Sequence, residues 1–184
     1  MSSSSNYSEE ALIKGLKKNK RKYQEMVYQK YASTMYAICL TYADSREEAK
    51  DILQEGFLKV FTKINTFQNT GSFGGWIRKI ITNTALDAYR KNARKRKDLV
   101  LNDEIYSDDE RVDNHILEEI NSKSLIQKIS SLPQGARVVF NLYAVEGYSH
   151  KEIAEKLDIS VGTSKSQFNR ARSLLKQKIN NSEI

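Results

Sequence analysis

The polar side chains of one segment near the carboxyl end have the types and spacing to bind DNA. Successive residues of a helix are rotated by about 100°, and at that spacing four polar side chains cluster on one side: Lys165, Ser166, Asn169 and Arg170. Arg172 and Lys176 flank this cluster, where long cationic side chains reach phosphates, and residues 159–180 include no acidic residue. A major groove lined by hydrogen-bond acceptors suits such a surface. The pattern predicts hydrogen bonding to base edges and ionic contact with phosphates.

Two short helices joined by a tight turn are expected to position this surface. Ser149 and Glu152 have the spacing of a capping box, which begins a helix. The apolar residues that share one face of this first helix are Ile153, Ala154 and Leu157. Residues 158–160 break the period, and Ser160 can cap a second helix. The apolar arc of that second helix is Phe168, Ala171, Leu175 and Ile179. This is the layout of a helix-turn-helix, with an ordinary amphipathic surface helix as the alternative.

A second candidate surface lies where aromatic residues flank a polar loop. The loop covers residues 65–72 and contains Phe67, and Phe73 and Trp76 follow it directly. Aromatic rings beside a polar loop can stack on unpaired bases. The helix expected after the loop carries three polar residues on its outer side: Lys79, Asn83 and Arg90. This combination suits single-stranded DNA. The alternative is that the three aromatic rings close the end of a helical core.

A third candidate surface is the outer face of a helix expected over residues 46–64. Its apolar stripe consists of Leu53, Phe57, Val60, Phe61 and Ile64. The residues that lie away from the stripe are Asp51, Gln54, Glu55, Leu58 and Thr62. A leucine among polar residues is typical of a helix face that binds a partner. Because singly exposed leucines are common, these residues alone favour a plain solvated face.

The composition predicts an all-α fold with two small helical domains. The chain has 184 residues with 39% hydrophobic content, enough for two modest cores. Helix formers are plentiful, Pro133 is the only proline, and there are eight glycines. Before the second domain we expect helices over residues 9–42, with a break near residues 17–22, over residues 46–64, and from residue 73 onward.

The two expected domains are joined by an acidic segment. The net charge of +7 is unevenly distributed, because a basic run over residues 90–97 precedes an acidic stretch in which Arg111 is the only Lys or Arg. This stretch has few large apolar residues and no helical period, which predicts a flexible, solvated linker. The predicted domains are residues 1–97 and 121–184, with the linker over residues 98–120.

The sequence offers little for catalysis. His115 lies in the acidic stretch and His150 at a helix start, without a cluster of Cys, Asp or Glu at metal-ligand spacing. There is also no phosphate-binding glycine loop, so we expect no enzyme, no metal and no cofactor. Cys39 lies in an apolar segment and is expected to be a buried small hydrophobe. With no secretory signal and no apolar run near about 18 residues, the expected location is the cytoplasm, without membrane insertion.

Three segments, in chain order, resemble the functional segments of bacterial sigma factors. DILQEGFLKVF at residues 51–61 resembles the segment of region two that binds the polymerase clamp. FQNTGSFGGWIRKIITNTALDAYRK at residues 67–91 is similar to the segment that melts promoters and recognises the upstream −10 element. Residues 132–172 are similar to region four. With no room for a region three, the chain resembles the small extracytoplasmic-function (ECF) group.

The resemblance implies a function and a set of contacts. The chain is expected to bind core RNA polymerase at the clamp helices and flap, and to direct it to promoters with particular −10 and −35 elements. The implied polymerase contacts are Asp51, Gln54 and Glu55, with Leu58 as a neighbour. The implied −10 DNA contacts are Phe67, Gln68, Asn69, Thr70, Ser72, Trp76, Lys79, Asn83 and Arg90. The implied −35 DNA contacts are Lys165, Ser166, Asn169, Arg170, Arg172 and Lys176. An anti-sigma factor is a further implied partner.

Two residues depart from the family pattern. Many members have an apolar β-branched residue where Ser164 stands and an arginine where Gln167 stands. Both residues are expected at or beside the DNA-reading face, which leaves the base preference at −35 open. The rival interpretation is a stand-alone repressor or activator that binds duplex DNA as a dimer through the helix-turn-helix alone. This rival predicts that changes at Asp51 or Glu55 leave DNA binding and regulation unaffected.

Overall fold

The computed structural model describes residues 7–100 and 128–180, and within these ranges every regular element is a helix. The all-α prediction is therefore confirmed. The chain divides into two compact units, Met1–Ala85 and Leu86–Ile184. Residues 98–100 are helical, and the rest of the predicted acidic linker lies outside the described residues. Among the described helices, none is both long and apolar enough to cross a membrane.

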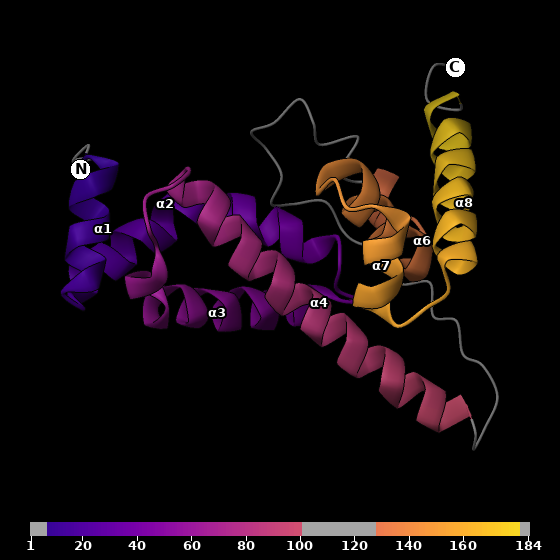
Figure 1. The fold of residues 1–184 in the computed structure, drawn as a ribbon, viewed down its shortest axis with the longest axis horizontal. Coiled ribbons are helices and arrows are strands. Elements are labelled where there is room, and N and C mark those ends of the chain that lie inside the picture. Colours follow the sequence, from indigo (N-terminus) through magenta and orange to yellow (C-terminus); the bar gives the residue numbers. More distant parts are fainter. Residues whose placement is uncertain (1–6, 101–127, 181–184) are drawn as a thin grey trace. The chain divides into compact units, whose positions relative to one another are not determined.

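The amino-terminal unit is built from helices that succeed one another along the chain (Figure 1). They are α1 (Glu9–Lys17), α2 (Arg21–Leu40), α3 (Arg46–Thr62), the short 3-10 helix η1 (Ile64–Thr66) and the first half of α4 (Phe73–Val100). The predicted break near residues 17–22 is confirmed, with Asn19 in the left-handed region at a φ of 51°. Ser45 caps α3 by accepting a hydrogen bond from the Glu48 N–H at 3.1 Å.

The core of this unit lies between the apolar stripes of these helices. Helix α2 packs against both α1 and α3. Of the apolar stripe predicted for residues 46–64, Leu53, Phe57 and Val60 of α3 and Ile64 of η1 are buried, whereas Phe61 is half-buried. Helices α3 and α4 approach closely at Gly56, because a Cβ there would lie 2.4 Å from Ile81 Cδ1. This close approach packs the inner side of α3 directly against α4.

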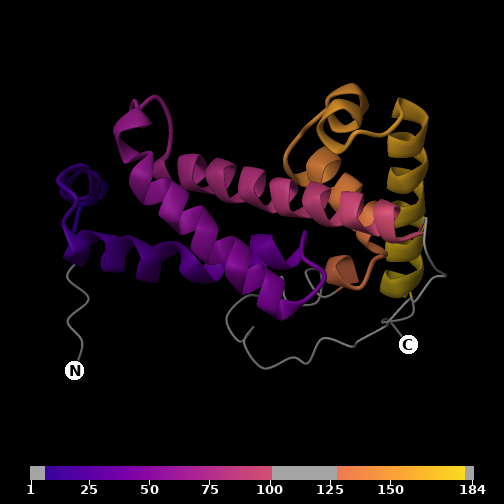
Figure 2. The ribbon, with the colours of Figure 1, turned by 90° about the horizontal axis from the view of Figure 1, so that it is seen from below.

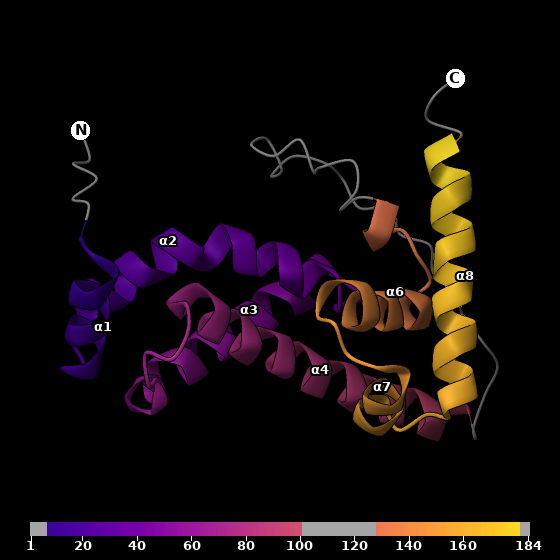
Figure 3. The same ribbon diagram turned by 45° about the horizontal axis from the view of Figure 1, so that its top comes forward.

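The carboxyl-terminal unit contains the predicted helix-turn-helix. After the helical residues 128–130, its elements are α6 (Gln134–Phe140), the π-helical turn η2 (Asn141–Val145), α7 (His150–Leu157) and α8 (Val161–Asn180). Both α6 and α7 pack against α8, and Figure 3 shows the short turn that joins α7 to α8. One buried cluster of this unit consists of Ile129, Leu132, Ala136, Ala171 and Leu175.

Candidate DNA and partner interfaces

The outer face of α8 is a continuous polar surface in solvent. The four residues predicted to contact bases, Lys165, Ser166, Asn169 and Arg170, are all exposed, as are Arg172 and Lys176. The opposite face packs inward through the fully buried Ala171 and through Leu175. The Arg172 guanidinium lies over the Phe168 ring, 5.9 Å from its centre, in a cation–π contact. The arrangement leaves one cationic face of a stable helix free to enter a groove.

Helix α7 and the turn after it hold α8 in place. The predicted capping box is confirmed: Ser149 Oγ accepts from the Glu152 N–H at 3.3 Å, and Glu152 Oε2 accepts from the Ser149 N–H at 2.8 Å. The Ser149 hydroxyl also donates to Glu152 Oε2 at 2.7 Å, and this bond, together with the one from the Ser149 N–H, holds the pKa of Glu152 below its usual value. Asp158 ends α7 in the left-handed conformation, with a φ of 56°. Ser160 then caps α8, as predicted, by accepting from the Thr163 N–H at 2.9 Å.

Ser164 is not on the DNA-reading face, so the sequence-based placement was wrong. Its side chain is fully buried, and its Oγ lies 2.9 Å from His150 Nδ1 of α7. Gln167 is half-buried and faces Gly135 of α6. The signal was present in the sequence, because seven residues at about 100° each place Ser164 within about 20° of the buried Ala171. The contact of His150 with Ser164 was missed because it joins two helices.

The polar loop between α3 and α4 rests on its aromatic residues. Figure 2 shows it as a turn linking the end of α3 to the start of α4. Phe67 and Phe73 are buried and Trp76 is half-buried, with 5.3 Å between the ring centres of Phe67 and Trp76. The rings close this end of the core, as the packing alternative predicted. Phe67 thus has a packing role, and its contact with a base stays a prediction.

The polar members of the same loop point into solvent. Four of the predicted −10 contacts are exposed: Gln68, Asn69, Thr70 and Ser72. Asn69 adopts the left-handed conformation at a φ of 56°, which a short polar side chain tolerates. Ser72 Oγ accepts from the Gly75 N–H at 3.1 Å and so caps α4. The loop therefore exposes hydrogen-bond donors and acceptors to solvent, while its aromatic rings pack against the core.

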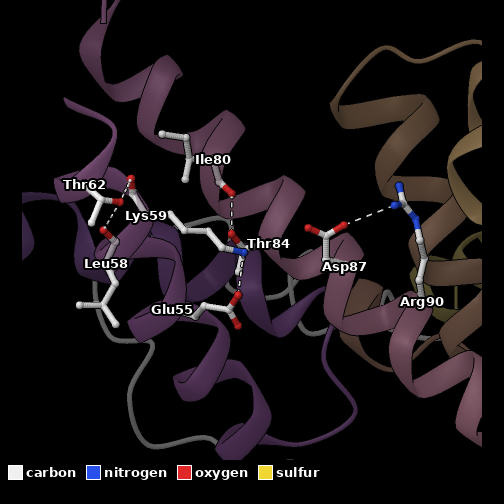
Figure 4. A network of polar contacts seen from close by, with 8 residues as sticks. All are labelled: Glu55, Leu58, Lys59, Thr62, Ile80, Thr84, Asp87 and Arg90. Carbon is white, nitrogen blue, oxygen red and sulfur yellow. Dashed lines mark hydrogen bonds and ion pairs between the residues drawn. The ribbon is translucent and has the colours of Figure 1, made fainter. Parts of the chain in front are cut away.

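The predicted DNA contacts along α4 differ in solvent exposure and in whether they already pair with another side chain. Lys79 and Asn83 are exposed. Arg90 is half-buried, and its Nη1 lies 3.3 Å from Asp87 Oδ1 one turn earlier (Figure 4). Any contact of Arg90 with a phosphate must therefore compete with this ion pair.

The predicted partner-binding residues lie together on α3. Asp51, Gln54 and Glu55 are exposed, and Leu58 is 64% exposed. Figure 4 shows Leu58 beside Glu55, whose Oε1 lies 2.6 Å from Lys59 Nζ. The backbone carbonyl of Leu58 accepts a hydrogen bond from Thr62 Oγ1 at 3.0 Å. An exposed leucine one turn after the carboxylate of Glu55 gives a partner both an apolar and an ionic contact.

The described residues hold no group of three or more His, Cys, Asp or Glu side chains that could bind a metal ion. His115, which the sequence placed in the acidic stretch, lies outside them. Cys39 is fully buried, and this burial raises the pKa of its thiol to about 12. A thiol in this state is a packing group.

Two family models match the chain in the order of its two units. Sigma-70 region 2 matches residues 27–95, and Sigma-70 region 4 matches residues 122–175. Together with an all-α fold that carries a helix-turn-helix, these regions define a sigma factor of the sigma-70 type. The chain belongs to the ECF group of bacterial RNA polymerase sigma factors.

Individual relatives agree with this assignment. The chain is 27% identical over 180 residues to the ECF RNA polymerase sigma-E factor of Haemophilus influenzae, covering 93% of this chain and 95% of that protein. It is 28% identical over 158 residues to the ECF sigma factor SigW of Bacillus subtilis, covering 81% and 84% of the two chains. The solved sigma factor RpoE of Bartonella quintana, in complex with the anti-sigma factor NepR, has a similar fold. Its TM-score is 0.53 at 18% identity, over 85% of this chain and 96% of that one.

Proposed function

We propose that this sigma factor binds core RNA polymerase through α3 and directs it to promoters through the loop before α4 and the outer face of α8. The observation that carries the proposal is the exposure of Asp51, Gln54, Glu55 and Leu58 on one face of α3, in the matched region 2. The same chain supplies a helix-turn-helix in its second unit. A stand-alone regulator has no need of the α3 surface.

On α3 the proposed partner is the pair of clamp helices of the polymerase. Asp51 and Glu55 offer carboxylates to basic side chains, and Leu58 offers an apolar contact. In the Glu55–Lys59 ion pair the Glu55 side chain is 59% accessible and Lys59 is half-buried, so solvent screens the pair and it can open at low cost when a partner cation replaces Lys59.

At the −10 element the proposed event is capture of a base flipped out of the duplex. Unstacking the base costs a few kcal/mol. Polymerase contacts and hydrogen bonds from the exposed loop residues would offset this cost; these residues are Gln68, Asn69, Thr70 and Ser72. Trp76 is half-buried and keeps part of its ring accessible beside the melted strand. Asn83 lies on the same outer side of α4 as Lys79, and Lys79 and Arg90 guide the backbone of the strand.

At the −35 element α8 lies in the major groove. Lys165, Ser166, Asn169 and Arg170 hydrogen-bond to base edges, and Arg172 and Lys176 neutralise phosphates. Neutralised phosphates release counterions, so promoter binding weakens steeply as salt rises. The second unit also contacts the polymerase flap in this proposal.

The proposal extends to the regulation and location of the chain. A solved relative of similar fold was captured with an anti-sigma factor, and we infer a partner of this kind for the present chain. The chain itself catalyses no reaction, needs no metal or cofactor, and works in the cytoplasm where the polymerase is.

Transcription from a promoter selected out of a random library, with purified core polymerase, tests the proposal. The folded chain should direct run-off transcripts from one start site, and their absence would overturn the proposal. A double variant, Asp51→Ala with Glu55→Ala, should lose polymerase affinity while its affinity for −35 duplex DNA is kept. Lys30→Ala is the matched control, because Lys30 is exposed on α2 and not on the helix that carries the proposed face. A stand-alone regulator would bind its operator without polymerase and ignore the double change.

A further inference from the structure

A basic segment at the end of α1 has no role in the function described so far. Residues 11–24 contain five lysines and one arginine and no acidic residue. The segment precedes the matched region 2, which begins at residue 27. Three of the lysines, Lys14, Lys17 and Lys18, are exposed and stand at the i, i+3 and i+4 spacing that puts side chains on one helix face. We refer to these three as the lysine row.

Helix α1 is firmly docked, so the lysine row has a defined place. Its inner side buries Leu12, Ile13 and Leu16. A Cβ on Gly15 would lie 2.1 Å from the Tyr23 ring, so α1 and α2 are in close contact there. Ser8 caps the helix by accepting from the Ala11 N–H at 3.3 Å.

The docking places the lysine row beside the start of the −10 loop. Helix α1 packs against η1, the element that leads into the loop. Lys17 Nζ donates to the backbone carbonyl of Phe67 at 3.5 Å. At the other end of α1, Glu9 Oε1 accepts from the Phe73 N–H at 3.3 Å, where the loop passes into α4. Contacts from one helix therefore reach both ends of the loop.

Within the basic segment the cations differ in what they already bind. Arg21 is paired with Glu25 at 2.9 Å, Lys22 donates to the Tyr7 hydroxyl at 3.1 Å, and Lys17 is committed to the loop. Lys14 and Lys18 flank Lys17 on the same face and are exposed. A cationic surface beside a base-binding loop is the arrangement by which proteins follow the backbone of single-stranded DNA.

We propose that the lysine row extends the −10 surface, with Lys14 and Lys18 binding phosphates of the melted strand next to the base held in the loop. The inference rests on the proposed role of that loop. It assigns to α1 a contribution to affinity that is independent of base identity, since ammonium groups bind phosphates as point charges.

The salt dependence of promoter binding tests this proposal. Holoenzyme is assembled with wild-type chain or with the double variant Lys14→Gln and Lys18→Gln, and its affinity for promoter DNA with a preformed −10 bubble is measured at several salt concentrations. The matched control is Lys30→Gln with Lys50→Gln, which removes the same charge from exposed lysines of α2 and α3. The slope of log affinity against log salt is negative, and each lost phosphate contact to a single strand reduces its magnitude by about 0.7.

The expected result is a slope reduced by about 1.4 in the test variant and unchanged in the control, with the same preference among −10 bases in all three. A wild-type slope in the test variant overturns the proposal. A loss of polymerase affinity at unchanged slope also overturns it, and would indicate that the lysine row binds an acidic protein surface instead. Failure of the proposed function itself is distinguishable, because the wild-type holoenzyme would then show no binding that depends on the −10 sequence.

Discussion

Leu58 tests the polymerase-binding face directly, because it is highly exposed and is the one apolar side chain among the proposed contacts. The side chain is 64% exposed, so a Leu58→Ala change should alter the free energy of unfolding by no more than about 0.5 kcal/mol. Complete burial of a leucine is worth about 1.5–3 kcal/mol. If core polymerase buries the exposed part, truncation costs about 1–2 kcal/mol of binding free energy, which corresponds to a rise in Kd of about 5- to 25-fold.

The measurement is a titration of fluorescently labelled chain with core polymerase, followed by fluorescence anisotropy. Thermal unfolding of each variant by circular dichroism checks that the fold is unchanged. Lys30→Ala should keep the wild-type Kd, since Lys30 is exposed on α2 and not on α3. A Leu58→Ala variant with wild-type stability and a Kd within twofold of wild type would refute the assignment of this face to the polymerase.

Three further predictions concern the second unit and the core. Arg170→Ala should weaken −35 DNA binding by about 1–3 kcal/mol and relax the base preference. Lys176→Ala should weaken binding to all DNA sequences alike and reduce the dependence of log affinity on log salt by about one, with both variants measured on a set of duplexes. Equal losses of affinity on every duplex for Arg170→Ala would contradict the base-reading role. Because the pKa of Glu152 is lowered in the folded state, its carboxylate contributes stability that is present above the usual pKa of about 4.3 and is lost as pH falls through the lowered value. Thermal melts should therefore show a larger drop toward acid pH for wild type than for Glu152→Gln, and parallel curves would argue against the capping box as the cause. Since burial raises the pKa of the Cys39 thiol to about 12, an aromatic disulfide reagent at pH 8 should label the unfolded chain at once and the folded chain only slowly; rapid labelling of the folded chain would contradict the buried position.

Much of the helical architecture could be predicted because its causes are local in the chain. The capping box of Ser149 and Glu152 depends on residues three apart, and the break between α1 and α2 on a short polar segment. The inward position of Ala171 and Leu175 follows from the helical period. The three family segments could be found for the same reason, since each is a contiguous run of residues.

Part of the site depended on contacts that no local pattern contains. From the sequence, Phe67 could either stack on a base or close the core, and the packing of Phe73 and Trp76 around it decided that it is buried. The helical period could have placed Ser164 near the buried Ala171, but the contact of Ser164 with His150 joins two helices, and no local pattern contains it.

The sequence by itself determined the helices, their polar and apolar faces and the family, because capping, helical period and contiguous motifs act over a few residues. The tertiary structure alone decided which of the polar faces remain in solvent and which helices meet the −10 loop. Glu9 and Phe73 are 64 residues apart, and Lys17 and Phe67 are 50 apart. Such contacts arise only when buried apolar faces bring distant segments together, so the place of the lysine row beside the loop is a property of the folded chain.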